Sequence, residues 1–402
     1  MRPLEFVHMA DTHLGYAQYN LEERLEDFNN AFREAVDKIL ELKPDFVLLC
    51  GDFFHHPRPS NATLEFAIEQ LCRLKVAGIP VLAIDGSHDS APNSMTGTIL
   101  RPLDSAGLIT YLPRRPGSCV EIGDCYVYGV GYLRSRARKA ELDEYLREIP
   151  PAPDPSKFNV MAFHMALALE ELGVPRHVAN VSPSDLPRGF DYYAGGHVHK
   201  PFLARLSELG LSQEGYLAYP GSTETVSYRE ADYDKGFYLV RVSADKDVEV
   251  ERIGLEGVRK FVVFEEDITG LEPSEATKHL IERVKALDER GAIIVPVIVG
   301  KLPPGALRSD IDLGAIRMAC QLALAVRPVV KVEEAGLEEI PALVEEREDL
   351  RARAFRYFLE AFKNRELWGL KPEELARVAV EILDPLLAGD KGKVKELLEG
   401  LL

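Results

Sequence analysis

The sequence predicts an α/β fold, and two observations lead to that prediction. In the first half of the chain, short hydrophobic runs alternate with longer segments whose apolar residues recur at helical spacing. This alternation is typical of strands and helices that follow one another along the chain. Residue types that bind metals come directly after five of the hydrophobic runs. Because open α/β sheets bind ligands beyond the carboxyl ends of their strands, this placement indicates one shared site.

The first half is expected to form one domain that a hairpin closes. The predicted strands are Leu4–Met9, Phe46–Cys50, Pro80–Ile84, Tyr126–Gly129, Asn159–Phe163 and Tyr192–Ala194. The predicted helices are Leu21–Glu41 and Asn61–Ala77. From Gly236 to Ile253 the pattern changes to two strands around a turn, which predicts the closing hairpin.

A smaller α/β unit and a helical segment are expected to follow. The predicted order in the smaller unit is strand Lys260–Phe264, helix Ser274–Asp288, strand Ala292–Val299, helix Gly314–Ala325 and strand Val329–Glu333. The last part is strongly charged, with predicted helices at Leu350–Asn364 and Pro372–Leu387. The expected domains are therefore residues 1–254, 258–334 and 338–402.

Composition narrows the class of protein. Among the 402 residues, 46% are hydrophobic, yet no apolar run reaches the roughly 18 residues that a membrane span needs. Five scattered cysteines favour a reducing cytoplasm. The net charge of −17 predicts weak nucleic-acid binding by the chain as a whole. Basic residues nevertheless cluster locally, at Arg114, Arg115, Arg134, Arg136, Arg138 and Lys139. No phosphate-binding loop of the nucleoside triphosphatase type is present, which argues against ATP hydrolysis.

The residues at the strand ends are of the types that can hold a pair of divalent ions. They are Asp11, His13, Asp52, His164, His197 and His199. Carboxylates with imidazoles suit Mn- or Fe-type ions, and two such ions ~3.5–4 Å apart are a common device for attacking a phosphate ester. Asp52 ends a buried run and could bridge two ions, because a buried charge needs a partner. Each fragment alone also fits a turn, a helix cap or a buried histidine, but the combination predicts a phosphoesterase.

Three further residues are candidates for the chemistry itself. His55 follows Asp52 closely and could orient a substrate phosphate. His88 stands next to Asp89, which is predicted to hold the imidazole as an acid for a leaving oxygen. His8 is not one of these candidates, because it lies inside the first strand and is expected to be a core residue.

The ordered motifs resemble those of a known family. D-x-H at Asp11, G-D-x-x-H at Gly51, G-x-H-D at Gly86, a single His164 and G-H-x-H at Gly196 resemble the calcineurin-like metallophosphoesterases. The finer resemblance is to the SbcD/Mre11 family of double-strand-break repair nucleases. It extends to Tyr219-Pro220-Gly221-Ser222 and Asp234-Lys235-Gly236-Phe237.

This resemblance implies a two-sheet sandwich flanked by helices, a small α/β capping domain, and a C-terminal helical segment that binds a partner. It implies two Mn(II) ions, one held by Asp11, His13, Asp52 and His199, the other by Asp52, position 87, His164 and His197. His88 would assist the leaving group and His55 would position the phosphate. The implied activities are DNA exonuclease and single-strand endonuclease, and the implied partners are DNA, a Rad50/SbcC-like ATPase and a second copy of the chain. Helices at 61–77 and 95–106 would form the homodimer.

One departure from the family pattern concerns Ser87, which stands where the family usually has Asn. A hydroxyl is a shorter and weaker ligand than an amide carbonyl. The chain is therefore either a natural variant with near-normal activity, an enzyme that needs more metal, or a chain in which activity was reduced by engineering. Two other functions remain open: a phosphoesterase acting on small molecules, and a scaffold that binds a partner through its C-terminal helices.

Overall fold

The computed structural model describes residues 3–90, 97–112, 119–132, 153–174, 179, 181–303, 305–334, 350–363, 370–387, 392, 393, 395 and 397. Within it the chain divides into two compact units, Met1–Lys260 and Phe261–Leu402. The three predicted domains stay a prediction. The predicted basic cluster at 114–115 and 134–139 lies outside the described residues.

The first unit is built on two sheets of six strands. The order in one sheet is β12 (Val248–Gly254), β11 (Gly236–Val242), β1 (Leu4–Met9), β2 (Phe46–Cys50), β3 (Val81–Ile84) and β4 (Thr110–Tyr111). The order in the other is β5 (Val120–Ile122), β6 (Cys125–Val130), β7 (Phe158–His164), β8 (Tyr192–Gly196), β10 (Tyr216–Tyr219) and β9 (Phe202–Arg205). The inner strands β1, β2 and β3 run parallel, as do β6, β7 and β8.

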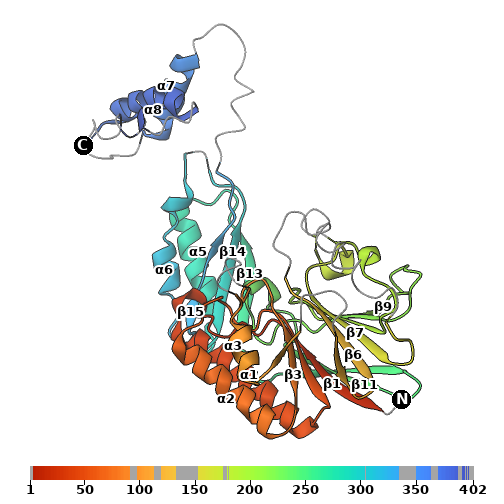
Figure 1. Cartoon of the computed structure of the whole chain (residues 1–402). Coiled ribbons are helices and arrows are strands. Elements are labelled where there is room, and N and C mark those ends of the chain that lie inside the picture. The colour runs from red at the N-terminus through yellow and green to blue at the C-terminus, as the bar shows by residue number, and fades with distance from the viewer. Residues whose placement is uncertain are drawn as a thin grey trace. The chain divides into compact units, whose positions relative to one another are not determined.

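Alternate residues of each strand point to opposite faces of the sheet, and this divides the buried residues into two layers. Phe6, Leu48 and Ile84 face the second sheet, where they meet Val160 and Ala194. Their neighbours along the strands pack instead against the helices α1 (Glu22–Leu42), α2 (Asn61–Val76) and α3 (Leu100–Ser105). Figure 1 shows these helices together on one side of the first sheet. The predicted α/β fold with a two-sheet sandwich is confirmed.

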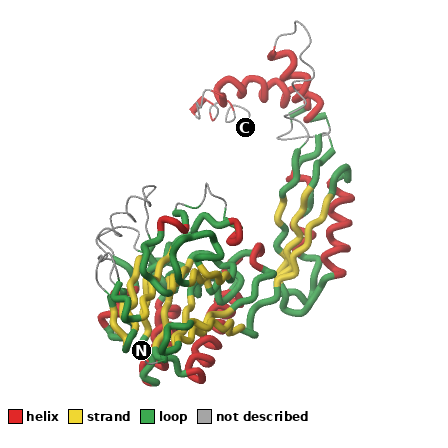
Figure 2. Tube along the Cα trace, turned by 90° about the vertical axis from the view of Figure 1, so that its right-hand side faces the viewer, coloured by secondary structure: helices red, strands yellow, loops and turns green. Residues whose placement is uncertain are grey.

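The second unit contains a small parallel sheet. Its elements are β13 (Phe261–Asp267), α5 (Pro273–Ala286), β14 (Ile293–Val299), α6 (Leu313–Arg317), β15 (Ala325–Val326) and β16 (Val329–Val330). In Figure 2 its strands, drawn in yellow, lie beside a helix, and Leu280 and Val284 of α5 share a core with Ile294 and Ile298 of β14. Two further helices are α7 (Leu350–Ala361) and α8 (Pro372–Leu387).

One predicted helix was too long. We expected Gly314–Ala325, but the helix ends at Arg317. The Asp288 carboxylate accepts hydrogen bonds from the backbone N–H groups of Gln321 at 2.9 Å and Ala323 at 2.8 Å, which holds the following segment in a turn. Short 3-10 helices elsewhere are Gln18–Asn20, Glu170–Leu172, Pro183–Asp185, Tyr228–Glu230 and Arg308–Asp310. None of the described helices is both long enough and apolar enough to cross a membrane.

Candidate metal centre

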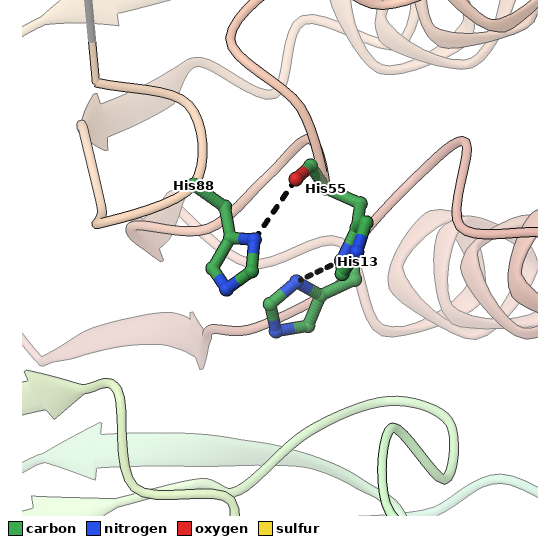
Figure 3. Close-up of side chains that lie close together, drawn as sticks. All are labelled: His13, His55 and His88. Carbon is green, nitrogen blue, oxygen red and sulfur yellow. Dashed lines mark hydrogen bonds between the residues drawn. The ribbon is translucent and has the colours of Figure 1, made fainter. Parts of the chain in front are cut away.

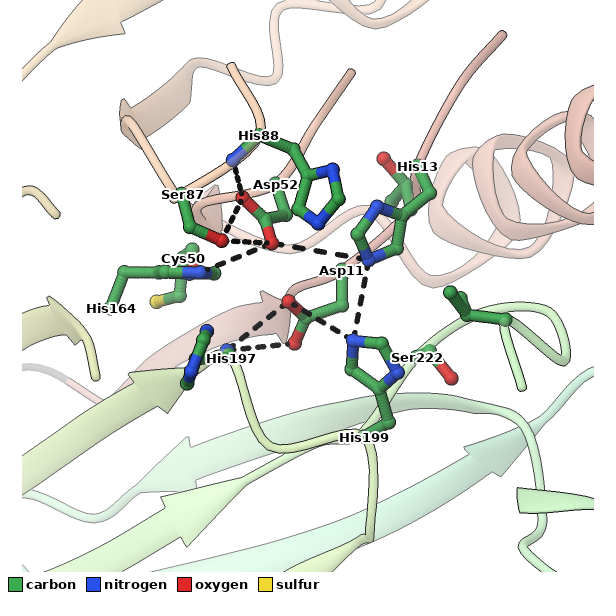
Figure 4. Close-up of polar contacts among 12 residues, drawn as sticks. Asp11, His13, Cys50, Asp52, Ser87, His88, His164, His197, His199 and Ser222 are labelled. Atoms are coloured by element: carbon green, nitrogen blue, oxygen red, sulfur yellow. Dashed lines mark hydrogen bonds and ion pairs between the residues drawn. The ribbon is translucent and has the colours of Figure 1, made fainter. Parts of the chain in front are cut away.

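The loops that follow β1 and β2 continue the pairing of the two strands. The Asp11 N–H donates to the Gly51 carbonyl at 3.1 Å, and the His13 N–H donates to the Asp52 carbonyl at 3.0 Å. Two parallel strands therefore deliver three candidate ligands to one edge of the sheet. Figure 4 shows their side chains pointing into a common space that residues of the other sheet also enter.

Four of the candidate ligands have strained backbones. Asp11, His13, Asp52 and His197 have φ angles of 55°, 46°, 50° and 84°. An L-residue in this left-handed region costs about 1–3 kcal/mol, and it persists only where the surroundings enforce it. Because strain of this kind collects at functional sites, its presence here supports a functional role for these residues.

Glycines allow the two sheets to meet at the site. A Cβ atom added to Gly196 would lie 1.9 Å from the Cys50 carbonyl oxygen, and one added to Gly86 would lie 2.2 Å from the Asp52 nitrogen. Only a residue without a side chain fits in either place. The bare backbone at Gly196 lets the end of β8 lie against the end of β2, and this brings His197 and His199 to the site.

Two groups of possible ligands face each other. In Asp11, His13 and His199, and again in Asp52, His164 and His197, one ligand atom per residue lies within 4.8 Å of the others. The His13 and His199 Nε2 atoms are 3.3 Å apart. Asp52 Oδ2 lies 3.2 Å from His164 Nε2 and 4.0 Å from His13 Nε2, so this carboxylate stands between the groups.

Two of the histidines are held so that their Nε2 atoms face the site. His164 Nδ1 donates to the Cys50 carbonyl at 2.8 Å, and His199 Nδ1 pairs with the Glu230 carboxylate at 2.7 Å. A carbonyl or carboxylate can only accept, so each Nδ1 carries a proton, and Nε2 is the atom left to bind an ion once any proton on it has been displaced. The buried His164 Nε2 faces the Asp52 carboxylate, with 3.2 Å between the nitrogen and Oδ2. This is the usual arrangement around a metal-binding histidine, so the residues fit a pair of divalent ions.

Burial and neighbouring charges shift the proton affinities of the cluster strongly. Burial raises the pKa of Asp11 to about 7. Burial alone would raise the pKa of Asp52 too, but His164 lowers it well below its usual range. The reverse holds for His164, since burial lowers its pKa but the Asp52 charge outweighs this and raises it to about 10. Without a metal, protons therefore occupy positions that a cation would take.

We expect metal binding to strengthen as the pH rises, because an ion must displace these protons. Below pH 7 both Asp11 and His164 must lose a proton, whereas between pH 7 and pH 10 only His164 must do so. The affinity should therefore rise more steeply below pH 7 than above it. Titration of the protein with Mn(II) at pH 6, 7 and 8 measures this, and an affinity that does not depend on pH would contradict it.

The predicted role of Asp89 was wrong. Its carboxylate does not hold the His88 imidazole but accepts the backbone N–H groups of Phe53 at 2.7 Å and Gly86 at 2.5 Å. Asp89 is buried, and these donors satisfy a carboxylate that water does not reach. The His55 carbonyl oxygen accepts from His88 Nδ1 at 2.9 Å instead (Figure 3). Asp89 thus positions the loops that carry Asp52 and His88.

The structure places the remaining predicted residues as follows. The Ser87 hydroxyl donates to Asp52 Oδ2 at 3.1 Å, and its role as a metal ligand stays a prediction. His55 stacks on Tyr16, with ring centroids 3.7 Å apart. Burial lowers the pKa of His55 to about 3 and keeps it neutral. His8 is a core residue as expected, bonded to the Tyr192 hydroxyl at 3.1 Å.

Sequence reasoning missed the groups that hold His199. The Glu230 carboxylate, which binds His199 through one oxygen, accepts the Lys235 ammonium at 3.0 Å and the Ser222 hydroxyl at 3.2 Å through the other. Burial would raise the pKa of Glu230, but His199 and Lys235 lower it to about 2. Ser222 and Lys235 belong to the later motifs, whose purpose the sequence left open. Glu230 ends the short 3-10 helix Tyr228–Glu230 in a polar segment that follows no hydrophobic run.

Replacing Glu230 by glutamine is expected to weaken metal binding by roughly 10–100-fold, the usual effect of losing a group that orients a ligand. The amide cannot balance the buried Lys235 charge, so His199 loses its fixed orientation. Isothermal titration with Mn(II) measures the effect, and the exposed Glu214→Gln serves as the matched control. Equal Mn(II) affinities in the two variants would show that Glu230 does not support metal binding.

Comparison with known proteins agrees with the motifs found in the sequence. Residues 4–201 match the calcineurin-like phosphoesterase family. A DNA double-strand break repair protein Mre11 from Methanococcus maripaludis is 33% identical over 268 residues, covering 65% of this chain and 69% of that protein. The Mre11 of Archaeoglobus fulgidus is 33% identical, and the match covers 72% of this chain and 67% of that protein. The Mre11 of Methanocaldococcus jannaschii is 32% identical, and the match covers 74% of this chain and 76% of that protein.

Proposed function

Because this chain belongs to the Mre11 family of DNA double-strand break repair proteins, we propose that it is a nuclease that cuts DNA at such breaks with two divalent metal ions. In this proposal the ions are Mn(II), and the enzyme acts as an exonuclease and a single-strand endonuclease. As an enzyme of DNA repair, it would work in the cytoplasm.

The observation that carries the proposal is the position of Asp52. Its Oδ2 atom lies within reach of both groups of possible ligands, 3.2 Å from His164 Nε2 and 4.0 Å from His13 Nε2. A carboxylate between two sets of imidazoles is what a bridge between two ions requires. Mn(II) accepts such a mixture of oxygen and nitrogen ligands.

The residues divide between the two ions as the motifs suggest. One ion would be held by Asp11, His13, Asp52 and His199, and the other by Asp52, Ser87, His164 and His197. When bound, such ions neutralise charge on a phosphate and make a water molecule nucleophilic.

His88 and His55 supply the remaining chemistry in this proposal. His88 is held through Nδ1 by the His55 carbonyl, so its Nε2 is the atom that can pass a proton to the leaving oxygen. If His13 uses Nε2 for metal, its Nδ1 proton points to His55 Nδ1, 3.3 Å away. His55 then carries its own proton on Nε2 and can donate it to a phosphate oxygen without being charged.

The rival function, a phosphoesterase for small molecules, shares this site and must be separated by substrate. Turnover of a nucleotide monoester should be compared with degradation of duplex and single-stranded DNA, both with Mn(II). We expect DNA to be the better substrate. Preference for the monoester would favour the rival.

We also propose that the C-terminal helices bind a Rad50/SbcC-like ATPase. Apolar residues recur at helical spacing in α7 and α8, and Tyr357 of α7 is 41% exposed. Deleting residues 340–402 is expected to leave nuclease activity unchanged and to abolish association with the ATPase. Co-elution of the truncated chain with the ATPase would refute this.

A homodimer through helices of the first domain is a separate proposal. Val76, at the end of α2, is 89% exposed, so its side chain is accessible to a second copy of the chain. Sedimentation velocity of the chain and of a Val76→Asp variant tests the proposal. A native chain that sediments as a monomer would contradict it.

A further inference from the structure

We propose that His13, His55 and His88 form a separate binding site for Zn(II) or a similar borderline ion, and that an ion bound there inhibits the enzyme. The three residues come from the loops after β1, β2 and β3, and one ligand nitrogen of each lies within 4.8 Å of the others (Figure 3). Binding can be judged by itself, whereas inhibition rests on the proposed function.

The spacing of the imidazoles suits a tetrahedral ion. His13 Nδ1 and His55 Nδ1 are 3.3 Å apart. With Zn–N bonds of ~2.0–2.1 Å, two ligands on a tetrahedral ion lie roughly 3.3–3.4 Å apart. The His88 ring completes the group, with its centroid 4.9 Å from that of His13 and 4.6 Å from that of His55.

Two of the rings are already oriented for binding. His88 Nδ1 donates to the His55 carbonyl, so in the neutral ring Nε2 offers its lone pair, as in zinc sites where the second ring nitrogen is fixed by a carbonyl. The His55 ring lies flat on Tyr16, with 19° between the ring planes. An ion would therefore meet a largely preformed site.

The ligand type distinguishes this site from the paired-ion site. The His13, His55 and His88 group contains no carboxylate, whereas each of the other two groups contains an aspartate. Imidazoles alone favour Zn(II), Cu(II) or Ni(II), and carboxylates favour Mn(II) and Mg(II). His13 faces both sites, with Nδ1 towards His55 and Nε2 towards His199. Filling both sites would require His13 to lose its Nδ1 proton to water, because Nδ1 would then serve the zinc site while Nε2 serves the paired-ion site.

Inhibition follows from which atoms the ion occupies. The ion would take the nitrogen of His88 that passes a proton to the leaving oxygen, and it would fix His55 away from the phosphate. The ligands Asp11, Asp52 and His164 are not involved. Zinc should therefore stop cleavage while Mn(II) stays bound, and added Mn(II) should not restore activity.

The test counts bound metals by elemental mass spectrometry after dialysis of the full chain against Zn(II) with excess Mn(II). The His55→Phe and His88→Phe variants should each retain one zinc ion fewer than the native chain. His56→Ala removes an exposed neighbouring histidine and should retain as many as the native chain. Thermal melting followed by circular dichroism verifies that each variant is folded.

Two results would overturn the site: equal zinc retention by the native chain and His55→Phe, or loss of one Mn(II) for every zinc gained. The second result would mean that zinc enters only the paired-ion site. These counts need no DNA, so a chain that proves inactive on DNA leaves them valid. If zinc binds as expected but cleavage with retained Mn(II) continues, the inhibitory role is wrong and the site stands.

Discussion

Replacing Asp52 by alanine is expected to abolish DNA cleavage. Asp52 Oδ2 is the atom that lies between the two groups of ligands, and the other oxygen accepts the backbone N–H of His88 at 2.7 Å. The substitution therefore removes the bridge and frees the loop that carries the proposed acid. We expect a loss on the order of 10³-fold or more, since metal ions and fixed charges supply much of the catalysis in such sites.

The measurement is the rate of degradation of linear DNA at saturating Mn(II). Asp37→Ala is the matched control, because Asp37 is an exposed aspartate on α1 whose carboxylate pairs with Arg73 at 2.6 Å. The control should retain full activity. A chain with Asp52→Ala that still degraded DNA would show that the two-ion centre is not the catalyst.

The second large effect is expected from Gly196→Ala. The added methyl would lie 1.9 Å from the Cys50 carbonyl oxygen and 2.8 Å from His164 Nδ1, both of which are held by neighbouring strands. The sheets must move apart, which breaks the hydrogen bond that orients His164. Overpacking of a closed core costs about 1–3 kcal/mol, so we expect a fall in the free energy of unfolding at the upper end of this range.

Urea denaturation of the metal-free chain measures this loss, and Mn(II) titration measures the damage to the site. Gly254→Ala is the control, since no atom lies within 4 Å of a Cβ added there. The control should match the native chain in both experiments. Native stability and metal affinity in Gly196→Ala would contradict the close contact between the two sheets.

The inner strands could be predicted from the sequence because they are buried on both faces. Such strands appear as continuous runs of apolar residues, and Phe46–Cys50 is buried along its whole length. The short strands β9 and β10 were missed, of which β9 lies at the edge of its sheet. In β9 partly buried and exposed residues alternate, so this strand has no continuous apolar run.

The candidate ligands could be predicted because each follows a buried strand directly, and parallel strands bring their ends together. Their tautomers and partners could not be predicted. The hydrogen bond from His164 to Cys50 joins residues 114 positions apart, and no local pattern reports it. Asp89 shows the same limit, since its sequence neighbour His88 proved not to be its partner.

Cleavage of plasmid and hairpin DNA across a Mn(II) titration, with the native chain beside Ser87→Asn, tests the central claim most directly. The Ser87 hydroxyl lies 3.1 Å from Asp52 Oδ2, at the position where the family has an amide. We predict that the native chain cuts both substrates and that the asparagine variant needs less Mn(II) to do so. If neither protein cuts DNA at any Mn(II) concentration, the chain is not a two-metal DNA nuclease.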